Sequence, residues 1–121
     1  ISGELDLSAT DFAHKNLDTD TELKILQYSL WEIEVLAEWN RESIESCLQN
    51  LAALMDLKIR DFLVPLFVSI SGNAVSTSVI ESILILRLDI VRARIRQGIL
   101  VLGGISKKQT KLLEKEYRSF R

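Results

Sequence analysis

Arginines in the stretch 89–97, DIVRARIRQ, are the side chains best placed to bind a ligand. Arg92 and Arg96 are four residues apart, so a helix places them on one face, whereas Arg94 points elsewhere. Basic side chains on such a face can hold nucleic acid through its phosphates. Solvation, or pairing with acidic residues of the same chain, is an equally good interpretation of these arginines.

The loop 71–78, SGNAVSTS, is a second candidate for ligand binding. Gly72 and Asn73 suit a backbone with positive φ, and Ser76 or Thr77 can cap a following helix. Backbone amides of a loop that leads into a helix N-terminus attract phosphate. From the residues alone, a surface turn without a ligand is the alternative.

No residues with the chemistry of a catalytic or metal centre stand together in the sequence. There is no glycine-rich phosphate loop, no Cys and His cluster at metal spacing, and no nucleophile with a histidine partner. His14 is the only histidine, and we expect it to face solvent. Cys47 is the only cysteine, and we expect a buried, inert thiol in a reducing compartment. We therefore expect no catalytic site, metal site or cofactor within these 121 residues.

Charge is divided unevenly along the chain. Residues 1–86 contain five basic and fourteen acidic side chains, a net charge of −9. Residues 87–121 contain ten basic and three acidic side chains, a net charge of +7. A basic region of this kind indicates a polyanionic partner without saying which one.

Residues that favour the start of a helix precede the apolar-patterned segments. These segments must position the candidate binding residues. Thr19 and Glu22 have the spacing of a capping box, which predicts a helix over about 20–38. Asn40 can cap a helix that begins at Arg41.

The C-terminal third shows the same kind of punctuation. Ser106 and Gln109 repeat the cap pattern and predict a last helix from Lys107 to about Ser119. Gly98, followed by the pair Gly103 and Gly104, marks expected breaks in the chain.

The segment 59–70 is too uniformly apolar to be assigned from its pattern. It is rich in β-branched and aromatic residues and contains Pro65, the only proline, so a strand and a buried helix are both open.

The order of residues from Trp39 to Ile99 resembles the anticodon-binding C-terminal region of bacterial-type glutamyl-tRNA synthetases. That pattern has an aromatic and a cap residue before a helix, then Gly-Leu-Lys, Pro-Leu-Arg-Val-Ala-Leu-Thr-Gly, a Leu-Gly pair and a final helix rich in Arg and Leu. The matching residues here are Trp39, Glu42 to Glu45, Leu57, Lys58, Pro65 to Gly72, Val79 to Glu81, Leu86, Arg87 and Arg92 to Ile99.

Three positions depart from the family pattern. Phe67 stands where the family pattern has an arginine, and the resemblance implies that this arginine contacts the anticodon. An aromatic ring can stack on a base but cannot form the same paired hydrogen bonds. Ser71 replaces threonine. Arg87 replaces the glycine of the Leu-Gly pair, where a left-handed backbone strains any residue with a side chain.

The resemblance implies an all-α fold, a compact bundle of about five to six helices. It makes 59–70 a helix with Pro65 in its first turn, where the missing amide costs nothing. Residues 21–99 would be the helical anticodon-binding region, 1–20 a partly ordered leading segment, and 100–121 a basic helical extension. The RNA-binding positions carried over, together with the basic helix, are Phe67, Ser76, Thr77, Val79, Arg92 and Arg96.

The implied parent is a glutamate–tRNA ligase that uses ATP and Mg²⁺ to attach glutamate to its tRNA. Its His-Ile-Gly-His and Lys-Met-Ser-Lys-Ser signatures are missing here, so the active site would lie in an upstream catalytic domain of the same chain. The expected partner is the anticodon arm of the glutamate tRNA. No apolar run approaches the roughly 18 residues of a membrane span, and we expect a cytoplasmic monomer.

Two other functions remain open from the sequence. A helical protein-interaction or regulatory module could use exposed apolar residues such as Trp31 and Val35. A helix-turn-helix DNA binder is the weaker alternative, because no short Gly-containing turn joins two helices with a polar base-reading face.

Overall fold

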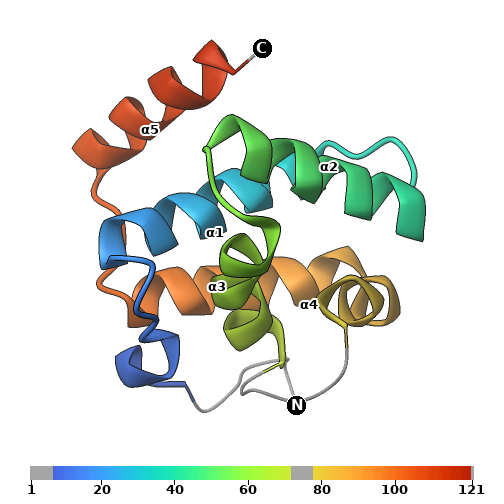
Figure 1. The fold of residues 1–121 in the computed structure, drawn as a ribbon, viewed down its shortest axis with the longest axis horizontal. Helices are drawn as coiled ribbons and strands as arrows, with labels where there is room; N and C mark the ends of the chain where they lie inside the picture. The colour runs from blue at the N-terminus through green and yellow to red at the C-terminus, as the bar shows by residue number, and fades with distance from the viewer. Residues whose placement is uncertain (1–6, 72–77, 121) are drawn as a thin grey trace.

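The computed structural model describes residues 7–71 and 78–120 of the chain, with the side chain of residue 71 left out (Figure 1). The elements in this described part are a short 3₁₀ helix and five α-helices, which confirms an all-α fold of the expected size. They are η1 (Ala9–Phe12), α1 (Thr19–Glu34), α2 (Arg41–Leu54), α3 (Ile59–Ser71), α4 (Val79–Val101) and α5 (Lys107–Ser119). None of these helices has the length and apolar character to cross a membrane.

The core lies where α1, α2, α3 and α4 meet. α3 packs mainly on α4, and α1 packs on α4 and on the helices beside it. α5 lies apart from these four, beside α1 (Figure 1). The largest completely buried side chains come from η1 and from α1 to α4, and they include Phe12, Tyr28, Ile44, Phe62, Leu66 and Ile83.

The N-terminal segment is more firmly docked than its polar sequence predicts. Phe12 is completely buried in the core. His14 does not face open solvent: its Nε2 lies 3.6 Å from a carboxylate oxygen of Asp61, a partner 47 residues away that sequence spacing could not reveal.

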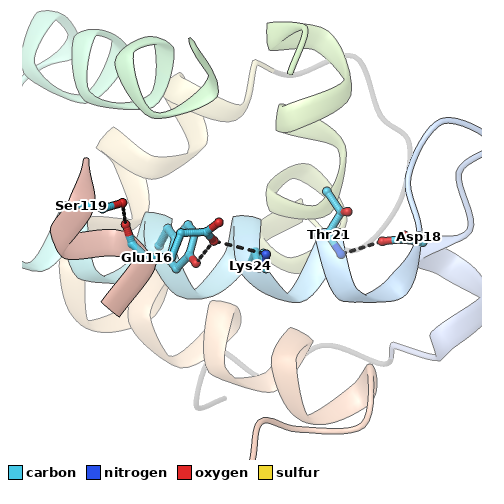
Figure 2. A network of polar contacts seen from close by, with 6 residues as sticks. Asp18, Thr21, Lys24, Glu116 and Ser119 are labelled. Atoms are coloured by element: carbon cyan, nitrogen blue, oxygen red, sulfur yellow. Dashed lines mark hydrogen bonds and ion pairs between the residues drawn. The ribbon is translucent and has the colours of Figure 1, made fainter. Parts of the chain in front are cut away.

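α1 begins one residue earlier than predicted and has a different cap. The carboxylate of Asp18 accepts a hydrogen bond from the amide of Thr21 at 2.8 Å, so Asp18 replaces the expected cap Thr19 (Figure 2). Glu22 therefore does not complete a capping box. It is 3% exposed, and burial, followed by the nearby charge of Asp18, raises the pKa of Glu22 to about 7. The helix ends at Glu34 instead of 38.

α2 has the predicted cap, because the Asn40 side chain accepts from the amide of Ser43 at 2.8 Å. Its end is a Schellman motif, in which the amide of Leu57 bonds to the carbonyl of Ala52 at 2.9 Å. Asp56 occupies the left-handed position of this motif with φ of 58°, where the Gly-Leu-Lys pattern has glycine.

The segment 59–70 is helical, as the resemblance implied, but the place of its proline was predicted wrongly. Pro65 is the seventh residue of α3 and not part of its first turn. Since proline has no amide hydrogen, the carbonyl of Asp61 lacks its usual helical donor. The helix survives because its apolar residues, such as Phe62 and Leu66, are completely buried against the rest of the core.

α4 contains two features that its sequence leaves ambiguous. Gly98 does not end the helix. It lies inside it, where an added Cβ would come within 2.3 Å of Ser69 Oγ on α3. Arg87 interrupts the helix with φ of 68° and ψ of 170°, and the two parts of α4 run in different directions (Figure 1). The strain expected from replacing glycine at this position is therefore present.

Candidate nucleic-acid interface

Arg94 joins α4 to the end of α3. Its Nη1 donates a hydrogen bond of 2.5 Å to the carbonyl of Ile70, in the last turn of α3. Carbonyls in a last turn lack helical donors and carry partial negative charge, so a cation there stabilises the helix end. Arg94 thus fixes the point from which the chain leaves α3 towards residue 72.

Arg92 and Arg96 share a face of α4, as their spacing predicts, and both point to one carboxylate on α1. Glu34 Oε2 lies 3.0 Å from Arg92 Nε and 3.6 Å from Arg96 Nη2. The Arg92 side chain is 34% exposed and that of Arg96 is 60% exposed. Pairing with the acidic half of the chain, one of the two interpretations of these arginines, therefore occurs in the structure.

The three arginines divide between two neighbours of α4. Two residues along a helix rotate the direction of a side chain by about 200°, so Arg94 points away from the side on which Arg92 and Arg96 contact Glu34. Four-residue spacing in the sequence indicates Arg92 and Arg96, but it carries no signal for Arg94, which is the arginine that contacts the end of α3.

α4 begins at Val79, after the residues 72–77 that the structure does not describe. Ser78 is the N-cap and makes no side-chain cap hydrogen bond. Val79 is only 7% exposed, so its side chain belongs to the core. A ligand could therefore contact Val79 only through its backbone. Ser76 and Thr77, the candidate residues before it, lie outside the described residues.

Contacts from α2 and from the residue before its cap hold this first part of α4. The indole Nε1 of Trp39 donates to the carbonyl of Leu84 at 3.3 Å, close to the break at Arg87. Arg41 Nη1 lies 2.9 Å from Glu81 Oε1 in the first turn of α4. Phe67, on α3, is partly buried and packs against the core.

Comparison with known proteins identifies the family. A family model described as "Anticodon binding domain" matches residues 1–99. The chain belongs to this family. It is homologous to the C-terminal region of bacterial glutamate–tRNA ligases.

Three ligases illustrate the similarity of this anticodon-binding domain to its relatives. It is 43% identical over 117 residues to the glutamate–tRNA ligase of Marinobacter nauticus, and these residues make up 97% of this chain and 24% of that protein. The corresponding enzyme of Alcanivorax borkumensis is 46% identical over 112 residues (93% of this chain, 23% of that protein). That of Psychrobacter cryohalolentis is 43% identical over 111 residues (92% and 22%). The chain thus spans about a quarter of these relatives.

The comparisons also bear on the basic C-terminal helix. The family model ends at residue 99, before α5 begins. The Marinobacter match covers 117 of the 121 residues and so extends into α5. The sequence of α5 is therefore matched in a curated ligase and is not peculiar to this chain.

Metal-binding groups do not gather in the part of the anticodon-binding domain that the structure describes. No three His, Cys, Asp or Glu side chains within residues 7–71 and 78–120 lie together in a way that could hold a metal ion. Cys47 is half-buried, and burial raises the pKa of its thiol to about 12.

Proposed function

We propose that this domain binds the anticodon arm of a glutamate-accepting tRNA as the C-terminal part of a glutamate–tRNA ligase. The observation that carries the proposal is the family match over residues 1–99, together with 43–46% identity to curated ligases. The whole enzyme would attach glutamate to tRNA with ATP and Mg²⁺ bound in an upstream catalytic domain. It would act as a cytoplasmic monomer, and the present domain would hold the anticodon arm while the acceptor end reaches that site.

The contact to the bases would form where α3 ends and α4 begins. The exposed part of Phe67 offers a surface for stacking on an unpaired base. Ser76 and Thr77 are candidates for polar contacts, and the first amides of α4, including that of Val79, have no partner within the helix and would bind phosphate or base oxygens. Arg94 would act as a positioning residue, because it holds the end of α3 that leads into this region.

Arg92 and Arg96 would supply phosphate contacts that weaken with salt. In the free domain both lie beside Glu34. Arg96 is the more exposed of the two, and exposed ion pairs contribute only about 0–1 kcal/mol, so an RNA phosphate can replace its contact with the carboxylate at small cost. Glu34 would then act as a competitor that weakens non-specific binding.

A direct test is to add the anticodon stem-loop of the glutamate tRNA to the isotope-labelled domain and follow its amide signals by NMR. We expect shifts around residues 67–79 and 92–96. A stem-loop with an altered anticodon should bind more weakly at matched salt. Shifts confined to α5 would contradict the proposed mode of binding.

The protein-interaction alternative loses much of its expected surface. Trp31 is not exposed as that alternative assumed, because its ring lies 5.2 Å from the ring of Tyr117 on α5. Val35, at 66% exposure, remains uncovered. A salt titration separates the two functions, since phosphate binding falls steeply with salt and apolar docking does not.

A further inference from the structure

α5 is attached to α1 through one aromatic cluster. The ring of Tyr117 lies 5.7 Å from that of Tyr28 and 5.2 Å from that of Trp31, and Phe120, which ends α5, meets Tyr28 edge-on at 5.7 Å. Aromatic pairs at these separations contribute stabilisation in addition to that from burying their surface area. The cluster therefore selects the face of α5 that must point inward.

Polar contacts fix the rotation of α5 about its own axis. The Tyr28 hydroxyl donates to Glu116, and Glu116 Oε1 lies 3.2 Å from Lys24 Nζ on α1 (Figure 2). The Tyr117 hydroxyl donates to Glu32. Consequently Glu116, one of the two acidic residues of α5, is turned towards the body of the domain.

The outward face of α5 is a stripe of basic side chains. At 100° per residue its members fall within an arc of about 100°, whose centre lies about 130° around the helix from Tyr117. The stripe consists of Lys107, Lys108, Lys111, Lys115 and Arg118, all exposed. Arg118 pairs with Glu114 at 3.7 Å, and among the described residues the four lysines have no ion pair within 4 Å.

The basic stripe is distant from the proposed base-contacting region. α5 lies at the upper left in Figure 1, whereas α3 ends at the lower edge, with α1 between them. We propose that the basic stripe is a second contact surface for the RNA backbone, which binds phosphates outside the anticodon stem-loop. This inference rests on the proposed function and adds a distinct surface to it.

The chemistry of the stripe favours a phosphate backbone over bases. Lysine presents a flexible point charge without the paired geometry that reads base edges. Lys107, Lys111 and Lys115 are spaced by four residues, or about 6 Å of helix rise, and no aromatic side chain in the arc could stack on a base. The stripe would therefore contribute affinity without sequence preference.

The test compares three variants of the 121-residue chain against fluorescent full-length tRNA and the isolated anticodon stem-loop, by anisotropy between 50 and 200 mM salt. The triple variant K107Q/K111Q/K115Q should lower the slope of log K against log salt by about 3 for tRNA. Its slope for the stem-loop should equal that of the unmodified chain. Arginine at the same three positions should restore the tRNA slope.

A matched control removes three exposed cations elsewhere, as K15Q/K58Q/R60Q. It changes net charge equally and should lower the tRNA slope far less. An unchanged tRNA slope in the K107Q/K111Q/K115Q variant, or an equal loss for the stem-loop, would overturn the second surface while leaving the proposed function standing. Failure of the unmodified chain to bind either RNA would overturn both.

Discussion

Arg87 is the residue at which this chain departs most clearly from favourable backbone geometry. Its φ of 68° and ψ of 170° lie in a region that essentially only glycine occupies, at a cost of order 1–3 kcal/mol. Arg87→Gly should therefore raise the free energy of unfolding by about 1 kcal/mol, after the greater chain entropy of unfolded glycine is included. Urea denaturation measures this change.

Arg87→Ala provides the control, since it removes the same exposed side chain but keeps the Cβ that causes the strain. Alanine should give no gain in stability. Equal stabilisation by alanine and glycine would show that the guanidinium, and not the backbone, is responsible.

Glu22 makes stability depend on pH in an unusual direction for a carboxylate. Its pKa is raised from 4.5 to about 7 by burial, so the folded state keeps a proton that the unfolded state loses above pH 4.5. Stability should fall as pH rises from about 5 to 7. Glu22→Gln should remove this fall and stabilise the domain at pH 8 by roughly 1–3 kcal/mol.

Thermal unfolding at pH 5 and pH 8 tests the role of Glu22. The exposed Glu38 serves as a control, and Glu38→Gln should have the pH dependence of the unmodified chain. If Glu22→Gln is no more stable than the unmodified chain at pH 8, burial does not hold the proton on Glu22.

Local structure was predicted best at positions where a residue type strongly favours one role, such as capping a helix or adopting a positive φ. Asn40 was identified as a cap, and glycine at 103 suits the positive φ of 112° that follows α4. Asp56 adopts a left-handed position without glycine, and only the glycine of the Gly-Leu-Lys pattern indicates this conformation. The cap of α1 was predicted one residue too late, because Thr19 and Glu22 have the spacing of a capping box, whereas Asp18 is the residue that caps the helix.

At the scale of helices, the close contact between α3 and α4 depends on Gly98. An added Cβ would lie 2.3 Å from Ser69 Oγ, and Ser69 is completely buried. Gly98→Ala should lower the free energy of unfolding by about 1–3 kcal/mol, because overpacking outweighs the better helix propensity of alanine. Chemical denaturation measures the loss.

A double-mutant cycle with Ser69→Ala identifies the cause of that loss. Ser69 Oγ is buried and has no hydrogen-bond partner among the residues that the structure describes, so its removal alone should cost little. The double variant Gly98→Ala/Ser69→Ala should recover part of the stability, though Ser69 Cβ remains 3.2 Å from the added Cβ. Additive losses would exclude this contact as the source of strain.

Helix existence was predictable from the residue pattern except at 59–70, where only the resemblance implied a helix, whereas helix interiors and contacts between helices were not predictable. Capping chemistry located the starts of α2 and α5. It could not show that Pro65 lies in the middle of α3 or that Gly98 lies inside α4, because burial overrides local propensity at both positions. The contact between Arg94 and Ile70 could not be predicted either, because it joins residues on different helices.

At the scale of the molecule, the acidic N-terminal part and the basic C-terminal part neutralise each other through pairs that bridge them. Glu34 is the main example, because its carboxylate lies beside both Arg92 and Arg96. A charge asymmetry of −9 against +7 therefore does not translate directly into free cations. RNA must compete with the domain's own carboxylates for these arginines.

This competition predicts that removing the Glu34 charge strengthens RNA binding. Glu34→Gln should raise affinity for the anticodon stem-loop about 3–10-fold and steepen its salt dependence by about one unit, as Arg92 and Arg96 become free to bind phosphate. Stability should change by less than about 1 kcal/mol, since the pairs are partly exposed. Glu38→Gln changes net charge equally but has no ion pair among the described residues, so it should have a much smaller effect. Weaker binding by Glu34→Gln would mean instead that Glu34 holds the two arginines in the orientation that RNA requires.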